Sequence, residues 1–195
     1  LFQRTLAALT RLQSAIVPPQ AGYSLIGYWK FDEGSGTSAT DSSGRNHTGT
    51  IASPTWAQGK VNTCLYFDGA GGSVVTVSDT DDLDISGAFT IMAWVNPDIS
   101  FTDWRTILVK NYVYFLYAGS TGYCGDGSLV GGFNAGFGNI IVCYSTPLTP
   151  EIWTHMALTY DGVSAFKLYI NGVYIQGASA SGALPATTDT LQIGA

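Results

Sequence analysis

The chain has 195 residues and is 46% hydrophobic and 13% aromatic, but only 11% charged. Eight Lys and Arg residues against fourteen Asp and Glu residues give a net charge of −6, which excludes a basic surface for nucleic acid. A membrane-spanning helix needs roughly 18 or more consecutive apolar residues, and the sequence contains no such run. Few charges combined with many Gly, Ser, Thr and Tyr residues are typical of an extracellular all-β domain.

The first 17 residues differ from the rest of the chain in their apolar spacing. Apolar residues recur there at steps of three and four: Phe2, Leu6, Leu9, Leu12 and Ile16. This spacing places them on one face of a helix, and the segment has no Gly and ends before Pro18-Pro19. We therefore predict an amphipathic α-helix over residues 1–17 and a Pro/Gly linker over residues 18–24.

From residue 25 onward, short apolar stretches are separated by Gly, Asp, Asn, Ser or Pro. The predicted strands are 25–31, 64–67, 73–77, 89–95, 104–110, 112–118, 139–144, 153–160, 165–170, 173–176 and 190–193. Asn171-Gly172 is the strongest hairpin signal, because a type I′ turn needs a positive φ at both central positions. The sequence predicts a two-sheet antiparallel jelly-roll sandwich over residues 25–195.

The three cysteines fit no zinc-binding pattern. Cys124 and Cys143 flank a Gly-rich stretch, and they can form a disulfide only if two strands bring them together. Cys64 lies inside an apolar run and is interpreted as a small core residue.

Several short blocks occur in the order of a known family. They are 27–36 (GYWKFDEGSG), 41–44 (DSSG), 65–69 (LYFDG), 89–95 (FTIMAWV), 153–162 (WTHMALTYDG) and 168–172 (LYING). As a set, they resemble the laminin G-like jelly roll of the concanavalin A-like lectin and glucanase superfamily. The family usually continues into a closing strand after an LQIGA-like strand, and this sequence stops there. Either the sequence is a fragment, or the sandwich has an edge that another segment must cover, such as a strand donated by a partner.

The predicted helix carries a second resemblance. Its run LTRLQSAI is similar to the C-terminal half of the long helix of type IV pilins and pseudopilins. This resemblance implies a surface fibre subunit that packs against like subunits. The alternative is an ordinary N-terminal helix.

Catalysis is not predicted. Glucanases of the superfamily present Glu, Asp and Glu at alternate positions of one strand, and no such run occurs here. Asp82 and Asp84 do alternate, but they lie in an acidic loop that is interpreted as a solvated turn. We interpret His47 as a solvated loop residue and His155 as a partly buried strand residue.

A structural Ca²⁺ ion is the one cofactor that the sequence suggests. Calcium takes carboxylate and carbonyl oxygens together, and loop 40–49 offers both kinds. The family resemblance implies Asp41 and Asp68 as carboxylate ligands, with Asn46 adding a carbonyl. The alternative is that Asp41 caps a turn through its own backbone.

Aromatic residues concentrate in the variable stretch 98–123 and in the loop 131–139. Sugars pack their C–H faces on aromatic rings and bond through their hydroxyl groups, so these stretches are the predicted ligand face. The candidate residues are Trp104, Tyr112, Tyr114, Phe133, Asn134 and Phe137. Alternatively, the rings cover a sheet or a subunit contact.

Together these features predict a non-catalytic, extracellular or cell-surface binding or adhesion module. Its expected partner is a glycan or a surface protein, and it would form the lectin-like head of a pilin-like fibre subunit. One alternative is a carbohydrate-binding module of a secreted glycoside hydrolase. Another is a structural spacer without a ligand.

Overall fold

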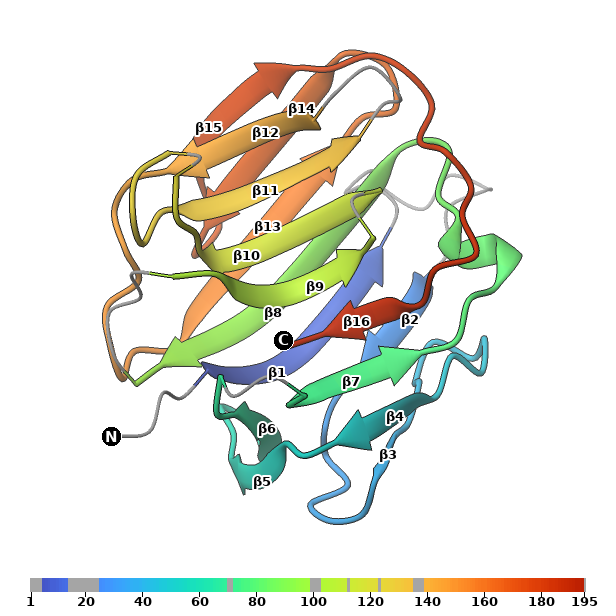
Figure 1. Cartoon of the computed structure of the whole chain (residues 1–195), viewed down its shortest axis with the longest axis vertical. Coiled ribbons are helices and arrows are strands. Elements are labelled where there is room, and N and C mark those ends of the chain that lie inside the picture. Colours follow the sequence, from blue (N-terminus) through green and yellow to red (C-terminus); the bar gives the residue numbers. More distant parts are fainter. Residues whose placement is uncertain are drawn as a thin grey trace.

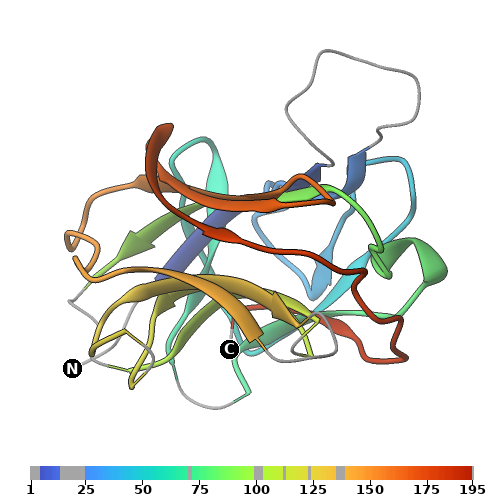
Figure 2. The same cartoon turned by 90° about the horizontal axis from the view of Figure 1, so that it is seen from above.

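The computed structural model describes residues 5–13, 25–69, 72–98, 103–111, 113–122, 124–134 and 139–194. In these residues, two antiparallel sheets of eight strands each pack face to face (Figure 1). Figure 2 shows the two layers from above, with the orange to orange-red strands of residues 165–179 in one layer and the yellow strands in the other. The predicted all-β sandwich is confirmed.

The strands of sheet A follow one another in the order β15 (Val173–Ser179), β14 (Ala165–Ile170), β13 (Thr154–Tyr160), β8 (Phe89–Pro97), β1 (Thr5–Gln13), β6 (Thr63–Phe67) and β5 (Thr55–Gln58). The eighth strand of this sheet, β2 (Leu25–Trp29), also pairs with β1. Sheet B has the order β12 (Asn139–Tyr144), β11 (Leu129–Asn134), β10 (Tyr114–Gly119), β9 (Arg105–Lys110), β16 (Leu191–Ile193), β7 (Val74–Val77), β4 (Gly49–Ala52), β3 (Ser38–Ala39). A short 3₁₀ helix, η1 (Asp81–Leu83), follows β7. The described residues contain no helix with the length and apolarity that a membrane crossing requires.

The prediction of an N-terminal helix is wrong for residues 5–13, which form strand β1 inside sheet A (Figure 1). Ala7 pairs with Val95 of β8 on one side and with Leu65 of β6 on the other. A strand between two others has backbone hydrogen-bond partners on both edges, whereas an isolated helix of this length is marginal in water. Residues 1–4 and 14–24, with the rest of the predicted helix and the linker, lie outside the described residues.

Strand β1 lies in the interior of sheet A. Within the described residues, β8 pairs with β13 and β1, and β6 pairs with β1 and β5. Sheet A is therefore continuous from β8 to β6, and the missing closing strand after residue 195 stays a prediction. The pilin-like stalk depended on the helix, and it has no support in this structure.

Most of the predicted strands are confirmed, and so is the hairpin between β14 and β15. Asn171 has φ 50° and Gly172 has φ 79°, as a type I′ turn requires. The sequence prediction missed β3, β4, β5 and β11. Strand β11 contains Gly131, where an added Cβ would lie 2.4 Å from a methyl carbon of Leu158, so the glycine lets the two sheets approach.

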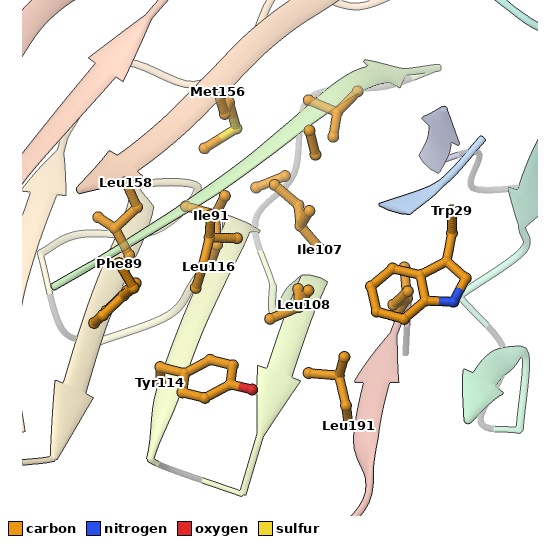
Figure 3. Packing of buried hydrophobic residues seen from close by; sticks show 14 of the residues in the cluster. Trp29, Phe89, Ile91, Ile107, Leu108, Tyr114, Leu116, Met156, Leu158 and Leu191 are labelled. Atoms are coloured by element: carbon orange, nitrogen blue, oxygen red, sulfur yellow. The ribbon is translucent and has the colours of Figure 1, made fainter. Parts of the chain in front are cut away.

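The core fills the space between the two sheets (Figure 3). Phe89 lies near its centre, with its ring centroid 5.9 Å from those of both Tyr114 and Tyr160. Trp29 is fully buried, and its indole Nε1 donates to the His47 carbonyl at 2.7 Å. This hydrogen bond satisfies the buried donor, as burial of a polar group demands.

The three cysteines form one disulfide and leave one free thiol. Cys124, in the loop after β10, and Cys143, on β12, form a disulfide with a Cα–Cα distance of 6.1 Å. Cys64 is free and fully buried, and burial raises the pKa of its thiol to about 12. A thiol with so high a pKa is protonated and unreactive at neutral pH.

Thiol titration tests this division. The oxidised protein should show no reactive thiol when folded, because Cys64 is buried, and one after denaturation without reductant. Denaturation with reductant should release all three thiols. Three thiols in the denatured, unreduced protein would contradict the disulfide.

A buried cation lies at the end of strand β9. Lys110 is fully buried, and its ammonium group donates to Asp79 at 2.7 Å and also to Asp84. Asp84 in turn accepts a hydrogen bond from the Thr187 backbone N–H at 3.2 Å. The acidic loop is therefore an anchor for β9 and for the segment before β16, and its interpretation as a solvated turn is wrong.

Replacing Lys110 by Met keeps most of the side-chain volume but leaves Asp79 and Asp84 without their cation. We expect Lys110→Met to lower the free energy of unfolding by about 3 kcal/mol, as for other broken buried ion pairs. Denaturant unfolding followed by intrinsic fluorescence measures this change. The matched control is Lys30→Met, which removes the exposed contact to Asp32 and should change the free energy by only about 0.5 kcal/mol. Equal effects of the two variants would contradict the anchoring role.

Candidate functional site

The outer face of sheet B carries a hollow of about 380 Å³. It lies over β9, β10 and β16, and its lining residues are Val109, Asn111, Tyr117, Asp189, Thr190 and Gln192. Val109 and Gln192 are direct partners across the β9–β16 ladder, so they share one face of the sheet. We call this feature the sheet B hollow.

One end of the sheet B hollow is polar. Asn111 follows β9, and its side-chain Nδ2 donates to the Asp189 carboxylate at 2.6 Å. Asp189 is held by its own backbone N–H, which donates to the Thr187 hydroxyl at 3.3 Å. The Thr187 backbone N–H donates to Asp84, so hydrogen bonds connect this arrangement to the ion pair of Lys110. An amide and a carboxylate thus enter the hollow in fixed orientations.

The other end is aromatic. Tyr117 packs edge-to-face against Trp104, with ring centroids 5.1 Å apart, and lies 5.2 Å from the Phe115 ring. Phe115 covers Gly132 of β11, where an added Cβ would lie 2.5 Å from the Phe115 ring. We call Trp104, Phe115 and Tyr117 the aromatic shelf; of these, Tyr117 lines the hollow and Phe115 is buried. Beside it, Asn111, Asp189, Thr190 and Gln192 offer hydrogen-bond donors and acceptors that suit hydroxyl groups.

The residues of the predicted ligand face lie in different parts of the structure. Trp104 lies on the aromatic shelf, and Asn134 is partly buried at the end of β11. Tyr114 and Phe133 are fully buried in the core, which excludes them from a ligand face. The Tyr114 hydroxyl donates to the Leu83 carbonyl at 2.9 Å. Tyr112 and Phe137 lie outside the described residues.

Sequence reasoning missed the polar half of the hollow. The available signal was the alternation of Thr190 and Gln192 with the buried Leu191 and Ile193, which marks an outward polar row. Asn111 carried no such signal, because its approach to Asp189 joins residues far apart in the chain.

Asp41, the first predicted calcium ligand, has the geometry of a turn cap. Its Oδ1 accepts from the backbone N–H groups of Tyr28 at 2.9 Å and Ser43 at 2.8 Å. Its Oδ2 accepts from the Ser43 hydroxyl at 2.6 Å and the His47 N–H at 3.0 Å. Burial raises the Asp41 pKa, but these hydrogen bonds outweigh it and hold the pKa below its usual value.

The alternative that Asp41 caps a turn accounts for these contacts. Asn46 has a φ of 64°. In the described residues, no three His, Cys, Asp or Glu side chains form a group that could hold a metal ion. Calcium binding by Asp41, Asn46 and Asp68 stays a prediction.

Substitution of Asp41 distinguishes a cap from a calcium ligand. Asp41→Ala should lower the free energy of unfolding by about 2 kcal/mol, because hydrogen bonds to a charged group are lost. For a cap, this loss is the same in excess calcium and in excess chelator, as thermal unfolding would show. A stabilisation of the unsubstituted protein by calcium that disappears in Asp41→Ala would instead support the metal site.

Asp79, Asp82 and Asp84 of the acidic loop are engaged in contacts with basic side chains. Asp82 contacts Arg45 at 3.1 Å and His47 Nε2 at 2.8 Å. His47 is buried, and its Nδ1 donates to the Ile26 carbonyl at 2.9 Å, so its interpretation as a solvated residue is wrong. His155 is half-buried on β13, as predicted, and burial lowers its pKa.

The fold and the hollow define a jelly-roll domain of the lectin type. The family model for the concanavalin A-like lectin/glucanases superfamily, laminin G-like type, matches residues 68–195. The chain belongs to this laminin G-like family. A sequence comparison with curated proteins gave no match.

Solved structures share the fold at low sequence identity. The binding domain of Paraclostridial Mosquitocidal Protein 1 has a TM-score of 0.66 and 17% identity, covering 95% of this chain and 44% of that one. Domain 4 of AbnA, an extracellular arabinanase from Geobacillus stearothermophilus in complex with arabinotriose, has a TM-score of 0.61 and 19% identity, covering 96% and 84%. The receptor binding domain of botulinum neurotoxin D has a TM-score of 0.60 and 15% identity, covering 80% and 41%. The chain thus spans less than half of the toxin chains that it resembles.

Proposed function

We propose that this chain is a non-catalytic, extracellular binding module that holds a neutral saccharide in the sheet B hollow. The observation that carries the proposal is the hydrogen-bonded pair of Asn111 and Asp189, which faces the same hollow as Tyr117. A fixed carboxylate and amide beside an aromatic ring match the alternating hydroxyl and C–H surfaces of a sugar. The ion pair beneath the polar end keeps these groups in place before any ligand binds.

Two further observations support the proposal. The similar structures are binding domains, and domain 4 of AbnA was solved with arabinotriose bound. The disulfide between Cys124 and Cys143 is typical of proteins in oxidising, extracellular surroundings. Attachment to a cell surface or to a secreted hydrolase fits the same binding chemistry equally well.

Binding of arabinotriose and of a neutral glycan array tests the proposal. Tyr117→Ala should lower the affinity for the glycan about tenfold, because an aromatic stacking surface is lost. Gln192→Ala should weaken it about fivefold through a lost hydrogen bond. The matched control is Gln176→Ala, an exposed glutamine on β15 of the other sheet, which should leave binding unchanged.

Thermal unfolding of each variant confirms that it is folded. No binding to any neutral glycan would overturn the proposal and favour the spacer alternative. Binding that is insensitive to Tyr117→Ala and Gln192→Ala would place the ligand elsewhere and would also overturn it.

A further inference from the structure

A second groove lies on the opposite face of the molecule, on the outside of sheet A. Its volume is about 460 Å³, and it runs over β8, β13 and β14. The lining residues are Met92, His155, Ala157, Thr159, Tyr160, Asp161, Ala165, Lys167, Tyr169 and Gly172. We call this feature the sheet A groove.

Strand register explains why a groove forms here. Ala157 lies directly between its cross-strand partners Met92 and Tyr169. In an antiparallel sheet such partners stand side by side, so a small residue between two large ones leaves a trough. Thr159, the next outward residue of β13, extends this floor and has Lys167 as its partner on β14.

Rigid rings stand along the groove. The His155 ring packs edge-to-face against Trp94, with centroids 5.2 Å apart, and the Tyr169 ring lies 5.9 Å from that of Tyr174. Asn171 fixes the His155 end, since its Oδ1 accepts from the His155 backbone N–H at 2.9 Å. The walls are therefore preorganised.

Two charged residues line this groove, Lys167 and Asp161, whereas the whole chain has a net charge of −6. Lys167 is exposed on one wall. Next to His155, outside the lining residues, the Lys60 ammonium lies 4.2 Å from the centroid of the Trp94 ring. Asp161 is the one carboxylate among the lining residues. Its Oδ1 accepts hydrogen bonds from the backbone of Val163, Ser164 and Ala165, so its charge is already offset by the turn.

We propose that the sheet A groove binds a saccharide chain that carries carboxylates, such as a uronate oligomer. A sugar ring stacks on Tyr169, and Lys167 pairs with a carboxylate. An extended acidic peptide fits less well, because peptides usually join a sheet at an open edge through backbone hydrogen bonds. On this face, the backbone groups of β13 are already paired with β8 and β14. This site is separate from the sheet B hollow and does not depend on it.

The test uses oligogalacturonate and the same oligomer with its carboxylates methyl-esterified, measured by calorimetry with the full chain. The acid form should bind more tightly than the ester, and its affinity should fall with added salt, because exposed charges are screened. Lys167→Gln should weaken the acid form about threefold and leave the ester unaffected. Tyr169→Ala should weaken both forms about tenfold.

Lys30→Gln is the matched control, since it removes the same charge from an exposed lysine outside the groove. Equal binding of acid and ester, no binding of either, or an equal effect of Lys30→Gln and Lys167→Gln would each overturn the proposal. Gln192→Ala and Tyr117→Ala should leave uronate binding unchanged, so this result is independent of the sheet B hollow. A uronate signal abolished by those two variants would assign the ligand to sheet B and overturn the second site.

Discussion

The contact of the Lys110 ammonium with Asp79 and Asp84 organises one end of sheet B. A fully buried cation is stable only when its partners are fixed, and here they come from the loop around η1. Asp84 also accepts a hydrogen bond from the Thr187 backbone N–H, and the Thr187 hydroxyl accepts one from the Asp189 backbone N–H. The charge therefore sets the path of the chain before β16, and with it the polar end of the sheet B hollow. Stability and the arrangement of the site have the same physical origin.

The period of two along a β-strand divides each strand between the core and the surface. Along β10, Tyr114 and Leu116 face the core, while Phe115 and Tyr117 face outward, and Phe115 is buried there. Along β13, in the same way, Leu158 lies in the core and Ala157 lies on the floor of the sheet A groove. A sandwich therefore offers two outer faces, and here the two differ in chemistry. The sheet B hollow presents an amide and a carboxylate, and the sheet A groove presents a lysine beside a tyrosine ring.

Sequence patterns predicted what depends on local chemistry. The Asn171-Gly172 turn is local, and the disulfide needed only that Cys124 and Cys143 come together. The patterns failed where distant residues decide the outcome. The spacing of Leu6, Leu9 and Leu12 indicates a helix, but β8 and β6 offer partners on both sides and a strand results. The sequence prediction places Tyr114 on a ligand face, because amino-acid composition does not tell which side of a strand a residue faces. The pairing register of the strands shows which rings point into the core. Asn111 and Asp189 meet through the tertiary fold alone.

The central place of β1 has a consequence for how the molecule acquires its structure. Residues 5–13 leave the ribosome before any of their partner strands. Ala7 nevertheless pairs with Val95 of β8, and β8 in turn pairs with β13. In the described residues, β1 is the strand that joins the β15–β8 half of sheet A to its β6–β5 half. Contacts between residues so far apart in sequence form slowly, because a long loop must close first. One edge of β1 therefore waits until β8 has been made, and this unpaired edge needs protection from other chains during that interval.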